Sequence, residues 1–363
     1  MKILLFIDNL GSGGAQRQIV TIAKLLKEKG FNVSFLVYGD ANFFEEEVKN
    51  NNIQIEYILT NNYLKRILSV RKFIRRNNFK VVISFLETPN FLNCIAAIGG
   101  KTWKVITNER SSKESTFLSL KGKIFAWFQR YSDSIVCNSN NAKSMWESYY
   151  PQYKNKLGVI YNSVTILNPE IAYVPKRDDK INILIVASYQ YLKNPLGVVK
   201  GLSLLDENER KKINVNWFGR IDVSGANLDA YKEAEKLIIK NELSQVIKLN
   251  NSTKKIEEEI KINDIVGLFS SVEGLPNAIC EAMMLGKPVI MTKVSDYEVL
   301  IDKSNGYLCD WNEIESINLV FKEVIRLDDK KIKLLGENSK IKADKLFSPN
   351  KIVKEWINEI YSH

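Results

Sequence analysis

Short apolar runs alternate with amphipathic stretches along the first half of the chain. Helical spacing of apolar residues predicts helices at Gln16–Glu28 and Leu64–Arg76. The apolar runs predict buried strands at Lys2–Ile7, Asn32–Val37, Val81–Phe85, Val105–Thr107 and Ser134–Asn138. Such βα alternation predicts a parallel sheet with helices on both faces.

The same pattern restarts after Asn162–Lys180, a stretch with Pro169 and Pro175 that is typical of a linker. Apolar runs predict strands at Ile181–Val186, Asn214–Phe218, Val246–Leu249, Asp264–Phe269 and Pro288–Met291. Helices are expected between these strands, including a charged helix at Leu228–Lys240. We therefore expect an α/β protein with two doubly wound parallel sheets, in domains 1–165 and 166–348. Ligands of such sheets bind beyond the carboxyl ends of the strands, and two facing sheets would leave a cleft between them.

The final segment, 349–363, has apolar residues on one side only: Ile352, Val353, Trp356, Ile357 and Ile360. An amphipathic helix of this kind has to pack on something. We expect it to pack back on the first domain.

Composition narrows the class of protein. Of 363 residues, 45% are apolar and 26% charged, as in soluble globular proteins. The four cysteines, at 94, 137, 280 and 309, form no C-x-x-C pair and suit reduced thiols in the cytoplasm. Asp8 interrupts the first apolar run, which favours a strand over a signal peptide, and no apolar run reaches the roughly 20 residues of a membrane-spanning helix.

The net charge of +10 is concentrated in the first half, where residues 1–165 contain 23 Lys/Arg and 12 Asp/Glu. The densest basic segment is 63–80. A basic amphipathic helix can lie on an anionic membrane, bind nucleic acid or simply face solvent. No nucleic-acid motif accompanies it, so we expect no nucleic-acid partner and keep solvent and the inner face of the plasma membrane as alternatives.

The most informative motif is E-G-L-P-N-A-I-C-E, from Glu273 to Glu281, between a predicted strand and a predicted helix. Gly274 permits a sharp turn before Leu275, and Pro276 suits the first position of a helix. Free amides at the helix start, near Asn277, would bind phosphate. Carboxylates beside a phosphate repel it, so Glu273 and Glu281 are better suited to hydroxyls of an attached sugar or ribose.

Two other loops that follow predicted strands contain candidate phosphate-binding groups. In the first, Gly13 and Gly14 let the backbone approach a diphosphate or an acceptor, although Gln16 replaces the third glycine of a dinucleotide fingerprint. In the second, Lys193 is predicted to begin a helix where a cation would pair with a diphosphate. Each of these also suits a structural role, as a strand–helix turn or a surface lysine.

Charged residues follow two further strands. Arg220 is a second cation at a strand end, or a plain surface arginine. Glu109 and Arg110 follow the strand that ends at Thr107, where charge is costly unless it faces a ligand or forms an internal ion pair.

Absent residues also constrain the chemistry. His363 is the only histidine, which excludes a histidine-based acid–base pair, and there is no D-x-D sequence to hold a metal on a nucleotide diphosphate. We expect no metal and no cofactor, so amides, helix dipoles and Lys/Arg would have to stabilise a leaving phosphate.

Together these residues resemble the retaining glycosyltransferases of family 4, which have the GT-B fold. The similarity spans nearly the whole chain, and its most specific part is Glu273–Val289. It also includes Gly13-Gly14-Ala15, Tyr161-Asn162, Lys193-Asn194, Val294-Ser295-Asp296, Glu298 and Asn305-Gly306.

The resemblance implies that the second domain binds a nucleotide sugar, expected to be a UDP-sugar, and that the first binds a glycan acceptor. Glu281 would hold the ribose, Glu273 the donor sugar, residues 274–277 a phosphate or the sugar, and Lys193 the diphosphate. The family usually has an arginine where this chain has Ser188, and Arg220 is a candidate replacement. Many members have a histidine near Asn108-Glu109-Arg110, and the version here resembles that of enzymes building bacterial surface polysaccharides.

Three hypotheses follow. The first is a metal-independent retaining transferase with a lipid-linked acceptor, in the cytoplasm or peripheral to the membrane. The second is a GT-B enzyme with a soluble acceptor, or a nucleotide-sugar epimerase. The third is a non-catalytic scaffold that binds sugar nucleotides.

Overall fold

The structure is a computed structural model that describes residues 1–110, 114–166, 180–221 and 228–362. Most of the predicted linker, residues 167–179, lies outside this range. The chain divides into two compact units. Unit 1 comprises Met1–Ser163 and Ser348–His363, and unit 2 comprises Val164–Phe347.

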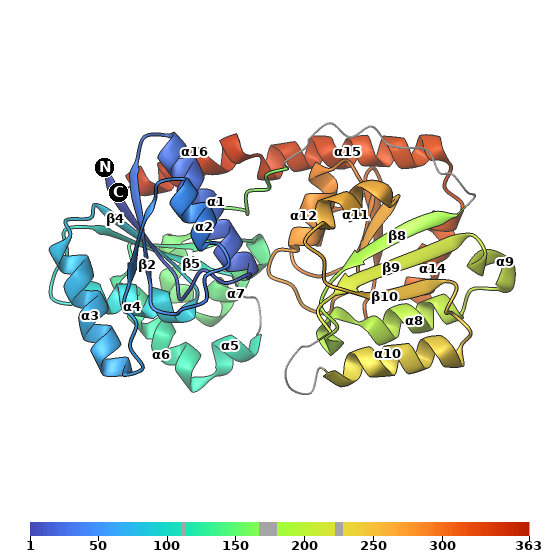
Figure 1. Cartoon of the computed structure of the whole chain (residues 1–363), viewed down its shortest axis with the longest axis horizontal. Coiled ribbons are helices and arrows are strands. Elements are labelled where there is room, and N and C mark those ends of the chain that lie inside the picture. Colours follow the sequence, from blue (N-terminus) through green and yellow to red (C-terminus); the bar gives the residue numbers. More distant parts are fainter. Residues whose placement is uncertain (111–113, 167–179, 222–227, 363) are drawn as a thin grey trace. The chain divides into compact units, whose positions relative to one another are not determined.

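Unit 1 contains a seven-stranded parallel sheet with the strand order β3-β2-β1-β4-β5-β6-β7. Figure 1 labels β2, β4 and β5 of this sheet. Its strands are β1 (Lys2–Phe6), β2 (Asn32–Val37), β3 (Gln54–Tyr57), β4 (Val81–Phe85), β5 (Lys104–Glu109), β6 (Ser134–Cys137) and β7 (Leu157–Val159). All five residues of β4 are buried, because helices cover both faces of the sheet. The α/β fold class expected from the sequence is confirmed.

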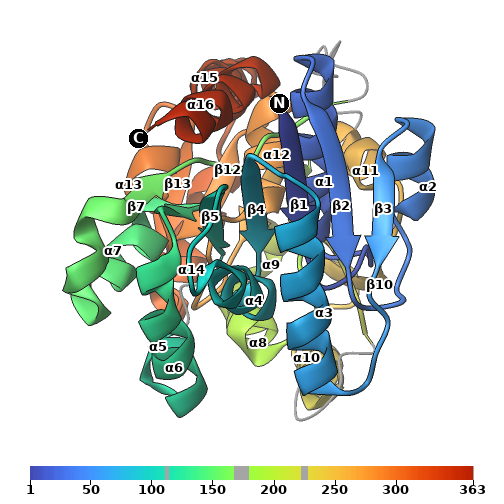
Figure 2. The ribbon, with the colours of Figure 1, turned by 90° about the vertical axis from the view of Figure 1, so that its left-hand side faces the viewer.

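The helices of unit 1 pack on both faces of this sheet (Figure 2). They are α1 (Gly14–Glu28), α2 (Glu45–Asn50), α3 (Tyr63–Arg76), α4 (Glu87–Ala97), α5 (Glu114–Leu118), α6 (Leu120–Phe128), α7 (Asn140–Tyr149) and α16 (Pro349–Tyr361). Side-chain caps begin three of them: Asn62 accepts from the Lys65 amide at α3, Ser119 from the Gly122 amide at α6, and Ser139 from the Ala142 amide at α7.

Helix α16 belongs to unit 1 although it is the last element of the chain. Its buried face contains Ile352, Val353, Trp356 and Ile360, and the Trp356 ring stacks on Phe85 of β4 at 6.1 Å. The Lys104 ammonium donates to Ser362 O at 2.8 Å.

Unit 2 contains a six-stranded parallel sheet with the order β10-β9-β8-β11-β12-β13. Its strands are β8 (Ile181–Val186), β9 (Ile213–Gly219), β10 (Ile247–Asn251), β11 (Ile265–Leu268), β12 (Val289–Thr292) and β13 (Gly306–Cys309). The largest buried side chains include Trp217, Tyr189 and Phe269.

The helices of unit 2 also lie on both faces of its sheet. They are α8 (Pro195–Ser203), α9 (Glu207–Arg210), α10 (Leu228–Lys240), α11 (Ile256–Ile262), α12 (Asn277–Met284), α13 (Tyr297–Leu300), α14 (Ile314–Ile325) and α15 (Asp329–Phe347). Two glycines let α15 approach the end of α12, since a Cβ on Gly336 would lie 2.1 Å from Gly286 O. Gly286 itself has φ +66°, a conformation that favours glycine.

Both sheets reverse their strand order at one point. In unit 1 the first strand, β1, lies between β2 and β4, and in unit 2 the first strand, β8, lies between β9 and β11. The loops beyond such a reversal part to opposite faces and leave a crevice that binds ligands in open α/β sheets. The two crevices are therefore the expected places of the candidate site residues.

Candidate active site

The crevice of unit 2 brings Lys193 and Glu273 together. Lys193 follows β8, Glu273 follows the neighbouring strand β11, and Lys193 Nζ lies 2.5 Å from Glu273 Oε1. Both side chains are mostly buried, with 19% and 13% of their surface exposed. The pair therefore combines a cation for phosphate with a carboxylate for hydroxyls at the carboxyl edge of the sheet.

Neighbouring groups hold these two loops in register. Ser270 Oγ donates to Glu273 Oε1 at 2.7 Å, and the Ser271 amide donates to Leu192 O at 2.8 Å. Thr292 on β12 donates to Ser270 O at 2.6 Å. The carboxylate of Glu273 is thus oriented from its own loop and from the loop of Lys193.

Lys193 does not begin a helix, so this part of the sequence prediction is wrong. It ends a short 3-10 turn, Tyr191–Lys193, and α8 begins at Pro195. Between them Asn194 adopts φ +61° and caps α8 through its side chain, which accepts from the Gly197 amide at 3.1 Å. This left-handed residue turns the chain, so Lys193 stays at the strand end rather than on the helix.

Helix α12 begins one residue later than predicted. Pro276 is the N-cap and Asn277 the first helical residue, because Pro276 has an extended ψ of 91°. The N-cap residue Pro276 has no side-chain hydrogen bond to the helix, and no acidic residue lies in the first turn of α12, so the positive end of this helix suits an anion. Glu281 lies a little over one turn into α12 and is half-buried.

The loop between Glu273 and α12 is supported from β12. Leu275 and Pro276 are buried, and the Ser295 hydroxyl, from the loop after β12, donates to Gly274 O. Ser295 has φ +55°, which turns its own loop toward Gly274. The Val294-Ser295-Asp296 segment of the family resemblance thereby supports the Glu273–Glu281 motif.

Ser188 and Arg220 lie at the ends of adjacent strands, β8 and β9. A Cβ on Gly219 would lie 1.9 Å from Ala187 O, so the two strand ends approach closely. The Tyr189 amide donates to Arg220 O at 3.2 Å, and the Arg220 side chain is exposed. Arg220 is thus at the carboxyl edge of the sheet, on the side of β8 away from β11, and its role as a replacement cation stays a prediction.

The glycine loop of unit 1 is packed by its own side chains. Gly13 is the N-cap of α1 without any side-chain cap, and Gly14 is the first helical residue. A Cβ on Gly13 would lie 2.1 Å from Gln16 Oε1, while Gln16 Nε2 donates to Asp8 Oδ1 at 3.1 Å. Gln16, which fails the dinucleotide fingerprint, instead orients Asp8 at the end of β1.

The crevice of unit 1 holds a pocket of about 280 Å³. Its lining comes from the ends of β1, β2, β4 and β5: Asp8, Tyr38, Leu86, Glu87, Thr88, Pro89, Glu109 and Arg110. Leu86 has φ +77°, a strained conformation for a bulky residue that is usually retained at functional sites. We call this pocket the unit 1 pocket.

Glu109 is the last residue of β5 rather than part of a loop, because β5 extends two residues beyond the predicted strand. It is 9% exposed, and Asn90 of α4 donates to its Oε1 at 2.9 Å. Burial, opposed by hydrogen bonds from Asn90 and Trp146 and aided by the nearby Glu87 carboxylate, raises the pKa of Glu109 to about 7. The group can therefore change its charge near neutral pH.

Arg110 takes different partners from its neighbour. Its guanidinium donates to Asn108 Oδ1 at 3.1 Å and Asn162 Oδ1 at 2.5 Å, and lies 5.0 Å from the Phe85 ring centre. Burial lowers the pKa of Arg110 to about 9, so it remains protonated at neutral pH. The Tyr161-Asn162 step of the family resemblance thus helps to position a cation at the unit 1 pocket.

Sequence reasoning missed several residues of this pocket. In the sequence Asp8 is marked only by its place at the end of the first apolar run, and Tyr38 and Leu86 belong to no motif. Their common signal was position, since each follows an apolar run at the carboxyl end of a strand. That signal could have found them once the strand order was known.

Much of the basic segment 63–80 has a structural role. Arg71 donates to the carbonyls of Ile95, Ala96 and Ile98 at the end of α4, and Arg75 donates to Gly100 O at 2.8 Å. Arg66 packs 4.4 Å over the Tyr38 ring. The cations that face outward from α3 and the turn after it are Lys65, Lys72, Arg76 and Lys80.

Two family descriptions match nearly all of the chain. Residues 12–166 match Glycosyltransferase Family 4, and residues 169–342 match Glycosyl transferases group 1. This chain is a family 4/group 1 glycosyltransferase of the GT-B fold. The site residues described above lie within the matched ranges, except for Asp8.

Relatives with assigned names agree with this family. A GalNAc-α-(1→4)-GalNAc-α-(1→3)-diNAcBac-PP-undecaprenol α-1,4-N-acetyl-D-galactosaminyltransferase of Campylobacter jejuni is 27% identical and aligns with 99% of this chain and 98% of its own length. A UDP-Gal:α-D-GlcNAc-diphosphoundecaprenol α-1,3-galactosyltransferase of Escherichia coli is 24% identical, over 82% of this glycosyltransferase and 79% of its own length.

A solved structure shares the fold over the full length of both chains. Anabaena Alr3699/HepE in complex with UDP superposes with a TM-score of 0.86 at 17% identity and 100% coverage of each chain. In the described part of this glycosyltransferase, no helix has the length and apolar character needed to cross a membrane.

Proposed function

We propose that this protein is a retaining, metal-independent glycosyltransferase that moves a sugar from a UDP-sugar to a lipid-linked glycan during synthesis of a bacterial surface polysaccharide such as O-antigen or capsule. The observation that carries the donor half is the Lys193–Glu273 pair, in the loops that lead to α8 and α12. The names of the relatives, which act on undecaprenyl-diphosphate-linked sugars, support the acceptor class.

In this proposal unit 2 binds the donor. Lys193 neutralises the diphosphate, the amides at the start of α12 bind a phosphate or the sugar, and Glu281 accepts hydrogen bonds from the ribose hydroxyls. Binding requires Lys193 to exchange Glu273 for phosphate, which frees Glu273 for hydroxyls of the transferred sugar. Arg220 is a further candidate for the diphosphate.

The reaction in this proposal takes place on one face of the sugar. As the glycosidic bond to the diphosphate breaks, the acceptor oxygen attacks the anomeric carbon, and its proton passes to the departing phosphate. Lys193 and the helix-end amides stabilise the growing negative charge, and preorganised groups of this kind are each worth about 3 kcal/mol. Glu109 and Arg110, in the unit 1 pocket, orient the acceptor hydroxyls.

A donor screen by thermal shift tests the first step, because a ligand that binds only the folded protein stabilises it. We expect stabilisation by UDP and one UDP-sugar, and slow release of UDP from that donor without added metal. Stabilisation by none of a panel of nucleotide sugars would contradict the donor site. UDP binding without turnover or hydrolysis would favour a scaffold.

Two substitutions test the residue roles. Lys193→Ala and Glu281→Ala are each expected to cost at least about tenfold in turnover or donor affinity, since each removes a charged partner of the donor. Lys232→Ala, at an exposed position on α10, is the matched control. Wild-type kinetics in either site variant would refute its assignment.

Peripheral membrane contact through unit 1, on the cytoplasmic face, is part of the proposal. Exposed apolar side chains accompany the outward cations: Leu64 and Leu68 on α3 are 71% and 66% exposed, and Leu120, Ile124 and Trp127 form one stripe on α6. Figures 1 and 2 both place α3 and α6 at the same end of unit 1. Exposed apolar side chains near cations suit an anionic lipid surface, because the apolar groups can enter the membrane interface while the cations contact the anionic headgroups.

Vesicle co-sedimentation tests this contact. Replacing Lys65, Lys72 and Arg76 by Gln should weaken binding to anionic vesicles at moderate salt, without the loss of stability expected at Arg71, which caps α4. The control removes three exposed cations of α15: Lys330, Lys331 and Lys333. Equal binding by both triple variants would exclude α3 as the contact.

A further inference from the structure

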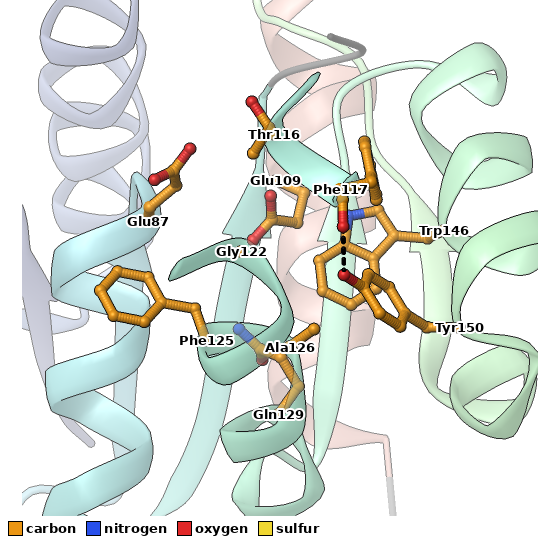
Figure 3. A pocket seen from close by; sticks show the side chains of 10 residues that line it. All are labelled: Glu87, Glu109, Thr116, Phe117, Gly122, Phe125, Ala126, Gln129, Trp146 and Tyr150. Carbon is orange, nitrogen blue, oxygen red and sulfur yellow. Dashed lines mark hydrogen bonds between the residues drawn. The ribbon is translucent and has the colours of Figure 1, made fainter. Parts of the chain in front are cut away.

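The carboxylate of Glu109 is held by side chains that have no part in the reaction described above. Two of them donate hydrogen bonds to it, Asn90 from α4 and Trp146 from α7. Figure 3 shows Glu109 with Glu87 on one side and Trp146 on the other. The position of this carboxylate at the unit 1 pocket is therefore set from two helices.

Asn90 fixes the carboxylate to the end of its own strand. Its Nδ2 donates to Glu109 Oε1 at 2.9 Å and to Asn108 O at 3.0 Å, and its Oδ1 accepts from the Asn108 amide at 3.3 Å. Asn90 is 1% exposed, and its own amide donates to Leu86 O at 3.0 Å. The unusual backbone of Leu86 thus starts α4 where Asn90 can reach β5.

The indole of Trp146 is fixed by packing. Its ring lies 5.8 Å from the ring of Phe117 and 5.1 Å from the ring of Tyr150. Tyr150 in turn donates its hydroxyl hydrogen to Phe117 O at 2.9 Å. Because Trp146 is only 5% exposed within this cluster, its N–H has little freedom to turn away from Glu109.

Both partners can only donate at these atoms. The amide NH₂ of Asn90 and the indole N–H of Trp146 are not acceptors, so they stabilise the ionised form of Glu109 and offer nothing to an added proton. An ionised carboxylate has about four acceptor positions. Two donors therefore leave positions free for hydroxyls in the unit 1 pocket, which Glu109 also lines.

We propose that Asn90 and Trp146 are positioning residues for Glu109, which accepts a hydrogen bond from an acceptor hydroxyl only while its carboxylate is ionised, so that transfer declines as the pH falls. Neither Asn90 nor Trp146 lines the unit 1 pocket, so both act through Glu109. This inference rests on the proposed function, because it makes the unit 1 pocket the acceptor site.

The groups that surround Glu109 leave it to titrate near neutral pH. Three of them stay neutral there, because burial raises the pKa of each: Cys94 on α4, Cys137 on β6 and Tyr150 after α7. The charged groups have partners of their own: Glu87 with Lys121, Lys143 with Glu147, and Arg110 with Asn108 and Asn162. Of these, Glu87 raises the pKa of Glu109.

The titration of Glu109 tests the positioning without any substrate. Carboxyl-carbon NMR of protein labelled at its Glu side chains follows this group, whose signal is identified by its loss in Glu109→Gln. Trp146→Phe removes the N–H and keeps an aromatic ring, so the midpoint for Glu109 should rise by about one pH unit, as expected when a hydrogen bond to a charged group is lost. Asn90→Asp still accepts from the Asn108 amide but no longer donates, and should raise the midpoint as well.

Transfer measured from pH 6 to 9 tests the effect on the reaction. The probes are the UDP-sugar that stabilises the protein in the donor screen and a panel of hexoses and N-acetylhexosamines linked through diphosphate to a short prenyl chain. For Trp146→Phe we expect kcat/KM for the acceptor to fall about fivefold at pH 7 and to recover at pH 9, with the donor KM unchanged. A purely structural role would lower transfer equally at every pH.

The control is Trp127→Phe, at an exposed position on α6, and thermal unfolding checks that each variant is folded. An unchanged midpoint for Glu109 in both Trp146→Phe and Asn90→Asp would overturn the inference and leave the transferase assignment standing. A loss of transfer that is the same at pH 7 and pH 9 would do so too. Absence of donor binding, with transfer to none of the probes, would instead refute the proposed function.

Discussion

The buried carboxyl of Glu109 makes the stability of unit 1 depend on pH. Burial raises its pKa from 4.5 to about 7, and each pKa unit between the folded and unfolded states corresponds to about 1.4 kcal/mol. The folded state holds the proton more tightly than the unfolded state. The stability that the folded state gains by holding this proton is therefore fully present below pH 4.5. It is lost as the pH rises through 7, and the free energy of unfolding falls by up to about 3 kcal/mol.

Glu109→Gln removes this loss because the amide does not ionise, and Gln can still accept the hydrogen bond from Asn90. We expect the variant to match the wild type in free energy of unfolding near pH 4.5. At pH 8 it should be more stable by as much as about 3 kcal/mol. The same variant should lose transfer activity, so greater stability would accompany weaker function.

Urea titrations followed by tryptophan fluorescence, at several pH values between 4.5 and 8, measure the difference. Glu46→Gln, on the exposed side of α2, controls for the removal of a negative charge. If Glu109→Gln and the wild type lose stability in parallel as the pH rises, burial does not set the protonation of Glu109 and the reasoning fails.

Three further predictions concern single side chains. Burial lowers the pKa of Lys287 to about 8, so protonation of this side chain destabilises the folded state. In urea titrations, the free energy of unfolding of the wild type relative to that of Lys287→Met should therefore rise as the pH increases from 8 toward 10. Because Leu86 has φ +77°, Leu86→Gly should be more stable than Leu86→Ala by about 1 kcal/mol, the reverse of the usual order; a more stable Ala variant would contradict strain at this position. Gly336→Ala should lower the free energy of unfolding by about 1–3 kcal/mol, because its Cβ meets Gly286 O, and an unchanged melting temperature would show that α15 can shift away from α12.

The sequence predicted the central strands of both sheets and missed three strands at their edges. Strands such as β1, β4 and β11 are buried on both faces and appear as continuous apolar runs. Strand β3, with the sequence Q-I-E-Y, is mostly exposed and has no such run, and β7 and β13 are short. An edge strand has only one neighbour, so its sequence is less constrained.

The donor motif was accessible from sequence, and the packing around Glu109 was not. Glu273 and Lys193 each follow a recognisable strand, and parallel pairing of β8 with β11 brings the two strand ends together. Trp146 lies mid-helix in α7 with no charge or motif to mark it. Only the packing of α5, α6 and α7 places its indole nitrogen beside Glu109.

Helix α16 has a consequence for the order of folding. Unit 1 is discontinuous in sequence, since Ser348–His363 completes a unit whose other residues precede Val164. During synthesis, unit 2 emerges whole while unit 1 still lacks Trp356, which covers Phe85. We therefore expect the unit made first to finish folding last, and a chain cut after Phe347 to leave the core of unit 1 exposed at β4.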